Sequence, residues 1–143
     1  RIKFPAFSLP KFDKPEVSII VPAYNKFELT YHCIASIALA YNKTSYEVIL
    51  ADDCSTDETT QAADIIENVV ISKNPENLRF LRSCNQASKI AKGEYIIFLN
   101  NDTEVTSYWL DELINKMKAD SSIGLTGYKL LNIDCTLKER GGS

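Results

Sequence analysis

The most informative stretch of the sequence is Tyr95-Ile96-Ile97-Phe98-Leu99-Asn100-Asn101-Asp102. Its first five residues are all apolar, and most are β-branched or aromatic, which favours a short buried strand. The next three residues, Asn100, Asn101 and Asp102, are all polar. In parallel α/β sheets, ligands bind beyond the carboxyl ends of the strands. The stretch therefore predicts a buried strand with a candidate binding turn at its end.

The segments on either side alternate between strand and helix patterns. Strands are predicted at residues 17–21 (stopped by Pro22), 46–51, 69–71, 95–99 and 123–128. Helices are predicted at residues 27–41, 55–68, 81–91 and 106 or 107 to 119, with a turn at 74–77. This alternation predicts an α/β fold, a three-layer α/β/α sandwich with a mostly parallel, Rossmann-like sheet.

Local signals refine two of these helices. Ser55 and Glu58 have the spacing of a capping box, so Ser55 is expected to start its helix. Trp109, Leu113 and Met117 recur at four-residue steps, which places them on the buried side of the last helix.

Residues 1–15 have a different character from the rest. Pro5, Pro10 and Pro15 disfavour both helix and central strand. We expect an extended arm or linker that packs on the domain through Phe4, Phe7 and Phe12. Residues 16–143 then form the domain proper.

Composition narrows the class of protein. The 143 residues carry a net charge of -3 with both signs interspersed, which excludes the electrostatic footprint of a nucleic-acid-binding protein. The four cysteines form no C-x-x-C pair and no disulfide framework, so we expect reduced thiols in a cytosolic compartment. No signal peptide or membrane-spanning run is visible. Because the chain starts at Arg1 and stops after two glycines, we expect a piece of a longer protein.

Three polar clusters follow three predicted strands. They are Pro22-Ala23-Tyr24-Asn25, Asp52-Asp53-Cys54-Ser55 and Asn100-Asn101-Asp102-Thr103. All should open at one edge of the sheet. Each cluster alone is consistent with an ordinary turn or helix cap, and Trp109, His32 and the cysteines are better explained as packed or surface residues. The shared edge favours a binding site.

The missing glycine motifs indicate how a nucleotide would be held. Neither G-x-G-x-x-G nor G-x-x-x-x-G-K-[ST] is present, so no glycine loop cradles phosphates. A divalent cation on a carboxylate is the substitute, because Mg²⁺ combines one or two protein carboxylates with substrate phosphates. Asp102 is placed for this, with Asn100 or Asn101 contributing a neutral oxygen. An aspartate of the 52–53 pair would accept a hydrogen bond from a base or ribose, and Tyr24 would stack on either.

These motifs resemble those of the family 2 inverting glycosyltransferases, which have the glycosyltransferase-A fold. The resemblance covers nearly all of residues 16–143 and rests on four segments. They are Val17–Asn25, Val48–Asp57, the helix-to-strand segment with Asn85-Gln86-Ala87 and Ala91–Ile96, and Phe98–Val105, which is similar to the D-x-D site. Cys54 stands where Gly is frequent, and Asn100 replaces the first Asp of D-x-D, which weakens the expected metal affinity.

The resemblance implies a role for each matched residue. Nucleotide-binding residues would be Pro22, Ala23, Tyr24, Asn25, Asp52, Asp53, Arg79, Asn85 and Asn101, and Asp102 and Asn100 would hold Mg²⁺ or Mn²⁺. The implied donor is a UDP- or dTDP-type sugar, and the acceptor is a glycan or lipid-linked molecule of bacterial cell-surface polysaccharide synthesis. The implied location is cytoplasmic, extending to the inner face of the membrane through parts outside this sequence.

The resemblance also places the general base beyond Ser143, in an acceptor half that this sequence lacks. We therefore expect weak donor binding and little or no catalysis from these 143 residues alone. Two alternatives stay open. One is a non-catalytic nucleotide-binding or interaction module that keeps the fold. The other, a phospho-receiver, fits less well because its acidic cluster should follow the first strand, where Pro-Ala-Tyr stands instead.

Overall fold

The structure is a computed structural model that describes residues 4–74, 76, 79–119 and 129–133. Its strands are β1 (Phe7–Ser8), β2 (Val17–Ala23), β3 (Tyr46–Asp52), β4 (Ile66–Glu67), β5 (Val70–Lys73), β6 (Tyr95–Leu99) and β7 (Lys129–Ile133). Its helices are α1 (Phe27–Leu39), the 3-10 helix η1 (Glu58–Gln61), α2 (Ala62–Ile65), α3 (Arg79–Lys89) and α4 (Trp109–Ala119).

The centre of the molecule is a parallel sheet with the strand order β5-β3-β2-β6-β7. The first strand of this sheet along the chain, β2, lies in the middle, between β3 and β6. The strand order reverses there, and ligands of open α/β sheets bind at such a point. This arrangement confirms the predicted mostly parallel, Rossmann-like sheet.

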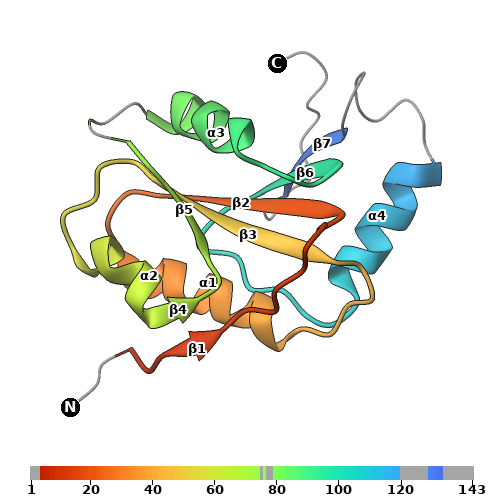
Figure 1. Ribbon diagram of the computed structural model, residues 1–143, viewed down its shortest axis with the longest axis horizontal. Helices are drawn as coiled ribbons and strands as arrows, with labels where there is room; N and C mark the ends of the chain where they lie inside the picture. The colour runs from red at the N-terminus through yellow and green to blue at the C-terminus, as the bar shows by residue number, and fades with distance from the viewer. Residues whose placement is uncertain (1–3, 75, 77–78, 120–128, 134–143) are drawn as a thin grey trace.

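Side chains alternate between the two faces of the sheet, and each face is covered by helices. Val17, Ile19 and Val21 of β2 share one buried cluster with residues of α1 and α4. Ile20 of β2 belongs to a second cluster with Ala87 of α3. Figure 1 shows α3 on one side of the sheet and α1 with α2 on the other. The three-layer α/β/α sandwich is therefore confirmed.

The predicted end of the first strand is wrong by two residues. β2 continues through Pro22 to Ala23, and these two residues pair with Ala51 and Asp52 of β3. The pairing of β2 with β6 has already ended at Ile20. At Pro22, β2 is therefore paired with β3 but no longer with β6. The missing N–H of Pro22 thus leaves no hydrogen bond to β6 unmade.

The predicted helix at residues 55–68 is present but shorter at both ends, because the helical segment covers only η1 and α2. The cap is Asp57, whose carboxylate accepts a hydrogen bond from Thr59 N at 3.0 Å. The Ser55 hydroxyl instead accepts one from Asn25 N, at 2.7 Å. The helical segment ends at Ile65, because Ile66 and Glu67 pair with β1 as a strand. Tertiary hydrogen bonds thus override the local capping signal.

Helix α4 starts later than predicted and takes its cap from another part of the chain. The Asn42 side-chain oxygen accepts hydrogen bonds from Leu110 N (3.0 Å) and Asp111 N (3.2 Å). Neither Thr106 nor Ser107 caps it with a side chain, and the Ser107 hydroxyl accepts a hydrogen bond from Tyr41 N. The buried residues are Leu110, Ile114 and Met117, with Trp109 and Leu113 packed beside them.

The arm formed by residues 4–15 packs on the domain through its aromatic rings, as predicted. Phe4 and Phe7 contact Tyr31 with ring centroids 5.1 and 5.4 Å apart, and Phe12 contacts Tyr46 at 6.0 Å. The arm also contains β1, which pairs in parallel with β4 and was not predicted.

Two predicted elements fall on residues that the structure does not describe. The strand predicted at residues 123–128 lies outside the described residues, as do parts of the turn at 74–77. The strands predicted at residues 46–51, 69–71 and 95–99 and the helix predicted at 81–91 lie within two residues of β3, β5, β6 and α3, whereas β4 and β7 have no predicted counterpart at their positions. No helix in the described part of the chain is both long and apolar enough to cross a bilayer.

Candidate functional site

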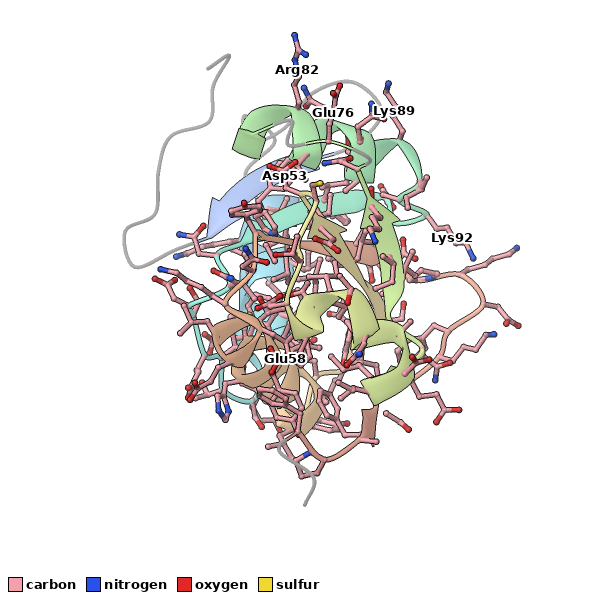
Figure 2. The ribbon with its side chains drawn as sticks, turned by 90° about the vertical axis from the view of Figure 1, so that its left-hand side faces the viewer. Asp53, Glu58, Glu76, Arg82, Lys89 and Lys92 are labelled. Atoms are coloured by element: carbon pink, nitrogen blue, oxygen red, sulfur yellow. The ribbon has the colours of Figure 1, made fainter. Side chains whose placement is uncertain are left out.

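A cavity of about 400 Å³ opens at the carboxyl ends of β2, β3 and β6. A volume of this size is typical of small-ligand sites. The described residues that line it are Pro22, Ala23, Tyr24, Lys26, Leu29, Asp53, Asn101 and Asp102. In Figure 2, Asp53 lies below α3 and Glu58 lies farther down the molecule. The edge of the sheet that the sequence singled out therefore carries a cavity.

The loops after β2 and β3 are joined by hydrogen bonds centred on Asn25. The Asn25 side-chain oxygen accepts bonds from Thr56 N at 2.7 Å and Asp57 N at 3.2 Å. The backbone N–H of Asn25 donates to the Ser55 hydroxyl at 2.7 Å. Asn25, in the loop after β2, thus bonds with three polar groups of the loop after β3.

Asp57 extends this connection to α1. Its carboxylate accepts bonds from Phe27 N, the first residue of α1, and from Thr59 N, each at 3.0 Å. Burial raises the pKa of Asp57, but the hydrogen bonds from Thr59 and Phe27 outweigh it and hold the pKa below its usual value. The carboxylate is therefore charged at neutral pH, where it stabilises the start of both helices.

The two neighbouring aspartates after β3 lie in different surroundings. Asp52 is 1% exposed, and its carboxylate accepts a bond from Ser55 N at 2.9 Å, so it shapes the turn. Asp53 is 6% exposed and lines the cavity. Its carboxylate accepts a bond from the Asn74 amide at 3.1 Å, and its N–H donates to Ala23 O. Asp53 is therefore the member of the pair that a ligand reaches.

The loop after β6 is held along α1 by three small polar residues at three-residue steps. The Thr30 hydroxyl accepts a bond from the Asn101 amide at 3.0 Å. The Cys33 thiol donates to Asn100 O at 3.7 Å, and the Ser36 hydroxyl accepts from Val105 N at 3.0 Å. This spacing places the three residues on one face of a helix. The sequence shows this spacing, but a contact face of a helix is normally recognised by apolar residues, and these three are small and polar.

The Cys33 thiol is an uncharged part of this contact. Burial raises its pKa to about 12, and the nearby carboxylates of Asp102 and Glu104 contribute to the rise. Cys33 and Cys84 are both buried, reduced thiols. Cys33 therefore serves as a small packed donor, in agreement with the prediction of core thiols.

Asp102 stands at the exposed end of the cavity. No group of three or more His, Cys, Asp or Glu side chains among the described residues could enclose a metal ion. The donor set fits a hard cation that brings most of its ligands with it, such as Mg²⁺ or Mn²⁺ on a diphosphate, since such ions need one or two protein carboxylates. The geometry offers Asp102 for that role, while Asn100 is not among the described lining residues.

The predicted nucleotide-binding residues divide into three groups. Pro22, Ala23, Tyr24, Asp53 and Asn101 line the cavity. Asn25 and Asp52 lie behind it and hold the loops. Asn85 is exposed on α3, whereas the side chain of Arg79 lies outside the described part of the chain. Lys26 and Leu29 also line the cavity. Neither is predicted as a site residue, because Lys26 follows the polar cluster at residues 22–25 and Leu29 lies within the helix predicted at 27–41.

The sequence matches the family model "Glycosyl transferase family 2" over residues 18–132, which include all of the cavity residues. The chain belongs to this family. The family's model spans β2 to β7 apart from the last residue of β7 and the first of β2, so the cavity lies within the family domain.

Solved and curated relatives agree with this assignment. A crystal structure of Staphylococcus aureus TarS (residues 1–349) in complex with UDP is 29% identical, with a TM-score of 0.62, and the match covers 73% of this chain and 32% of that one. The fold is thus that of the glycosyltransferase-A type. A poly(ribitol-phosphate) β-glucosyltransferase from Bacillus spizizenii is 34% identical over 75% of this chain and 18% of its own length.

A third relative is the Escherichia coli UDP-Glc:α-D-GlcNAc-diphosphoundecaprenol β-1,3-glucosyltransferase WfaP. It is 37% identical over 69% of this chain and 38% of its own length. The chain therefore spans less than two fifths of each of these relatives.

Proposed function

We propose that this domain binds the donor of a glycosyltransferase that moves a sugar from a nucleoside diphosphate to a glycan or lipid-linked acceptor, with inversion. The observation that carries the proposal is the cavity itself. It combines an exposed aromatic ring (Tyr24) and a buried carboxylate (Asp53) on one side with a solvent-facing carboxylate (Asp102) on the other. These groups suit a base, a ribose and a metal-bound diphosphate.

Each side of the cavity has a separate task in this proposal. Tyr24 stacks on the base or ribose, and Asp53 accepts a hydrogen bond from a base N–H or a ribose hydroxyl. Pro22 and Ala23 form the apolar wall beside them. Asn101, anchored on Thr30, presents a neutral oxygen near the diphosphate. Asn25 and Asp52 act through the loops that they hold.

Asp102, with Asn100 as the second candidate ligand, would hold Mg²⁺ or Mn²⁺. When bound, the ion supplies positive charge to the leaving nucleoside diphosphate. In the transfer, an acceptor hydroxyl oxygen bonds to the anomeric carbon from the face opposite the diphosphate. The bond from that carbon to the diphosphate oxygen breaks, and its electron pair leaves with the diphosphate. The acceptor proton goes to a general base, a role that we give to none of the described residues.

The relatives guide the choice of donor and acceptor. The TarS structure contains UDP, and WfaP is named for UDP-glucose and a diphosphoundecaprenol-linked acceptor. We therefore infer a UDP-type donor, with dTDP as the second choice, and a cytoplasmic role in cell-surface polysaccharide synthesis. We also expect little or no sugar transfer by the 143 residues alone.

Calorimetry of UDP and dTDP binding, with Mn²⁺ and with EDTA, tests this proposal. For the wild type, we expect binding that Mn²⁺ strengthens. For Asp102→Ala, we expect nearly all of that gain to be lost, because even the residues that support a metal ligand are worth about 10–100-fold in metal affinity, and the ligand itself matters more. Since Asp102 is exposed, the thermal unfolding midpoint of the Asp102→Ala protein should equal that of the wild type.

Two results would favour the non-catalytic alternative. One is the absence of binding by both nucleotides in the presence of Mn²⁺. The other is metal-dependent binding that Asp102→Ala leaves intact. A matched control is Glu104→Ala, which removes an exposed carboxylate two residues away that is not among the described lining residues.

A further inference from the structure

Lys26 brings a positive charge to a cavity that otherwise contains carboxylates. Among the described lining residues it is the single cation, beside Asp53 and Asp102. It is exposed and immediately precedes α1. It forms no ion pair with any residue that the structure describes. Its ammonium group is therefore available to a ligand.

The backbone of Lys26 is unusual for a lysine. Its φ is 56° and its ψ is 51°, in the left-handed region, and the preceding Asn25 has a φ of 56° as well. Glycine or asparagine occupies this region more readily than lysine does. Its side chain makes no cap hydrogen bond with α1. A residue held in this sparsely populated region beside a cavity is a candidate for a role in ligand binding.

The charges in the cavity indicate which part of a ligand the Lys26 side chain would bind. A nucleoside diphosphate brings several negative charges into a space that already contains two aspartates. A divalent cation on Asp102 offsets part of this charge. A lysine lining the same cavity offsets more, and hydrogen bonds between ions are stronger than those between neutral groups.

We propose that Lys26 binds the diphosphate of the donor and the same diphosphate as it leaves. The proposal rests on the proposed function, since it requires that the cavity accept a nucleoside diphosphate. It adds a residue to the site that strand-end motifs do not indicate. The left-handed backbone at residues 25 and 26, held by the Asn25 and Asp57 hydrogen bonds, places the Lys26 side chain at the cavity.

The test compares UDP with uridine, which lacks the diphosphate, in the presence of Mn²⁺. The variants are Lys26→Asn, which tolerates the left-handed backbone but has no charge, and Lys26→Arg, which keeps the charge. A matched control is Lys43→Asn, because Lys43 is an exposed lysine in the connection between α1 and β3 and is not among the described lining residues. Thermal unfolding is measured for each protein.

For Lys26→Asn, we expect about a tenfold loss of UDP affinity, the size of one hydrogen bond to a charged group. Uridine affinity should stay within about twofold, and the thermal midpoint should stay the same or rise by a few degrees as strain is relieved. Lys26→Arg should keep UDP affinity within about threefold, and Lys43→Asn should match the wild type.

Two results would overturn the assignment of Lys26 while leaving the proposed function intact. In the first, Lys26→Asn binds UDP as tightly as the wild type. In the second, it loses uridine and UDP affinity equally, which would indicate a structural role. If the wild type binds no UDP at all, the proposed function fails and this inference fails with it.

Discussion

The two sides of the cavity differ in how their residues are held. On the Tyr24 and Asp53 side, the loops after β2 and β3 are joined by side-chain to backbone hydrogen bonds through Asn25, and Asp53 is buried against Asn74. On the other side, Asn100 and Asn101 are held on α1, but Asp102 extends beyond those contacts into solvent.

In the proposed function, the two sides would hold different parts of the nucleotide, and neither requires a glycine loop. The side suited to the base and ribose is preorganised, so little ordering is needed when a ligand arrives. The side suited to the diphosphate offers the exposed carboxylate of Asp102, and the exposed Lys26 adds a positive charge from the loop after β2. Shape would come from the joined loops, and the response to the charge of the ligand and its cation from these two exposed side chains.

A shift of β6, which carries one side of the cavity, relative to β2, which carries part of the other, would disturb both sides at once. Gly93 precedes β6, and a Cβ there would lie 2.5 Å from Ser18 N and 2.6 Å from Val17 C, both backbone atoms of β2. We expect Gly93→Ala to lower the free energy of unfolding by about 3 kcal/mol, the scale of overpacking. Chemical denaturation measures this.

The neighbouring Lys92→Ala is the control for Gly93→Ala. Lys92 is exposed, and the hydrogen bond from its backbone N–H to the Glu47 carboxylate survives the substitution. The free energy of unfolding of Lys92→Ala should therefore stay within about 0.5 kcal/mol of the wild type. Equal stability of Gly93→Ala and the wild type would mean that the close approach of these strands is not needed.

A second prediction concerns Asn25, which joins the loops after β2 and β3 on the Tyr24 and Asp53 side of the cavity. Asn25→Ala removes the acceptor for Thr56 N and Asp57 N and places alanine at a φ of 56°, so we expect a loss of about 2 kcal/mol in unfolding free energy. Uridine affinity should fall as the two loops separate. Asn25→Asp keeps the acceptor oxygen and should recover most of both losses. Denaturation and calorimetry of the three proteins decide this, and a failure of Asn25→Asp to recover either loss would contradict the proposed network.

The negative charge of Asp53 would act on the base or ribose and not on the metal-bound diphosphate. Asp53→Asn keeps the size of the side chain and an oxygen that the Asn74 amide can bond, but it removes the charge. We expect uridine affinity to fall about tenfold, while the relative gain in UDP affinity from Mn²⁺ stays unchanged. A large loss of the Mn²⁺ gain would instead assign Asp53 to the metal side. Titrations of uridine and of UDP, with Mn²⁺ and with EDTA, distinguish these outcomes.

The sequence predicts the parts of this molecule that depend on local patterns. β6 has its predicted bounds because its five apolar residues are bordered by Gly93-Glu94 and Asn100. The alternation of strands and helices is sufficient to predict the parallel sheet. Because the strands are parallel, the polar residues that follow them lie at one edge of the sheet. Hence Tyr24, Asp53 and Asp102 could be predicted to converge.

What the sequence could not predict depends on contacts between distant segments. Ser55 has the local features of a cap, but it bonds with Asn25, thirty residues away in sequence. Helix α4 takes its cap from Asn42 rather than from its own first residues. Lys26 reaches the cavity because Asn25 and Lys26 adopt left-handed backbone conformations, which a residue pattern for a helix does not reveal.

A four-way titration of the wild type, in which uridine and UDP are each measured with Mn²⁺ and with EDTA, tests the proposed donor site most directly. We expect Mn²⁺ to strengthen UDP binding by about tenfold or more and to leave uridine binding unchanged within about twofold, since the ion would act through the diphosphate. UDP affinity that is the same with Mn²⁺ and with EDTA, or uridine affinity that depends on Mn²⁺ as strongly as UDP affinity does, would contradict the proposed donor site.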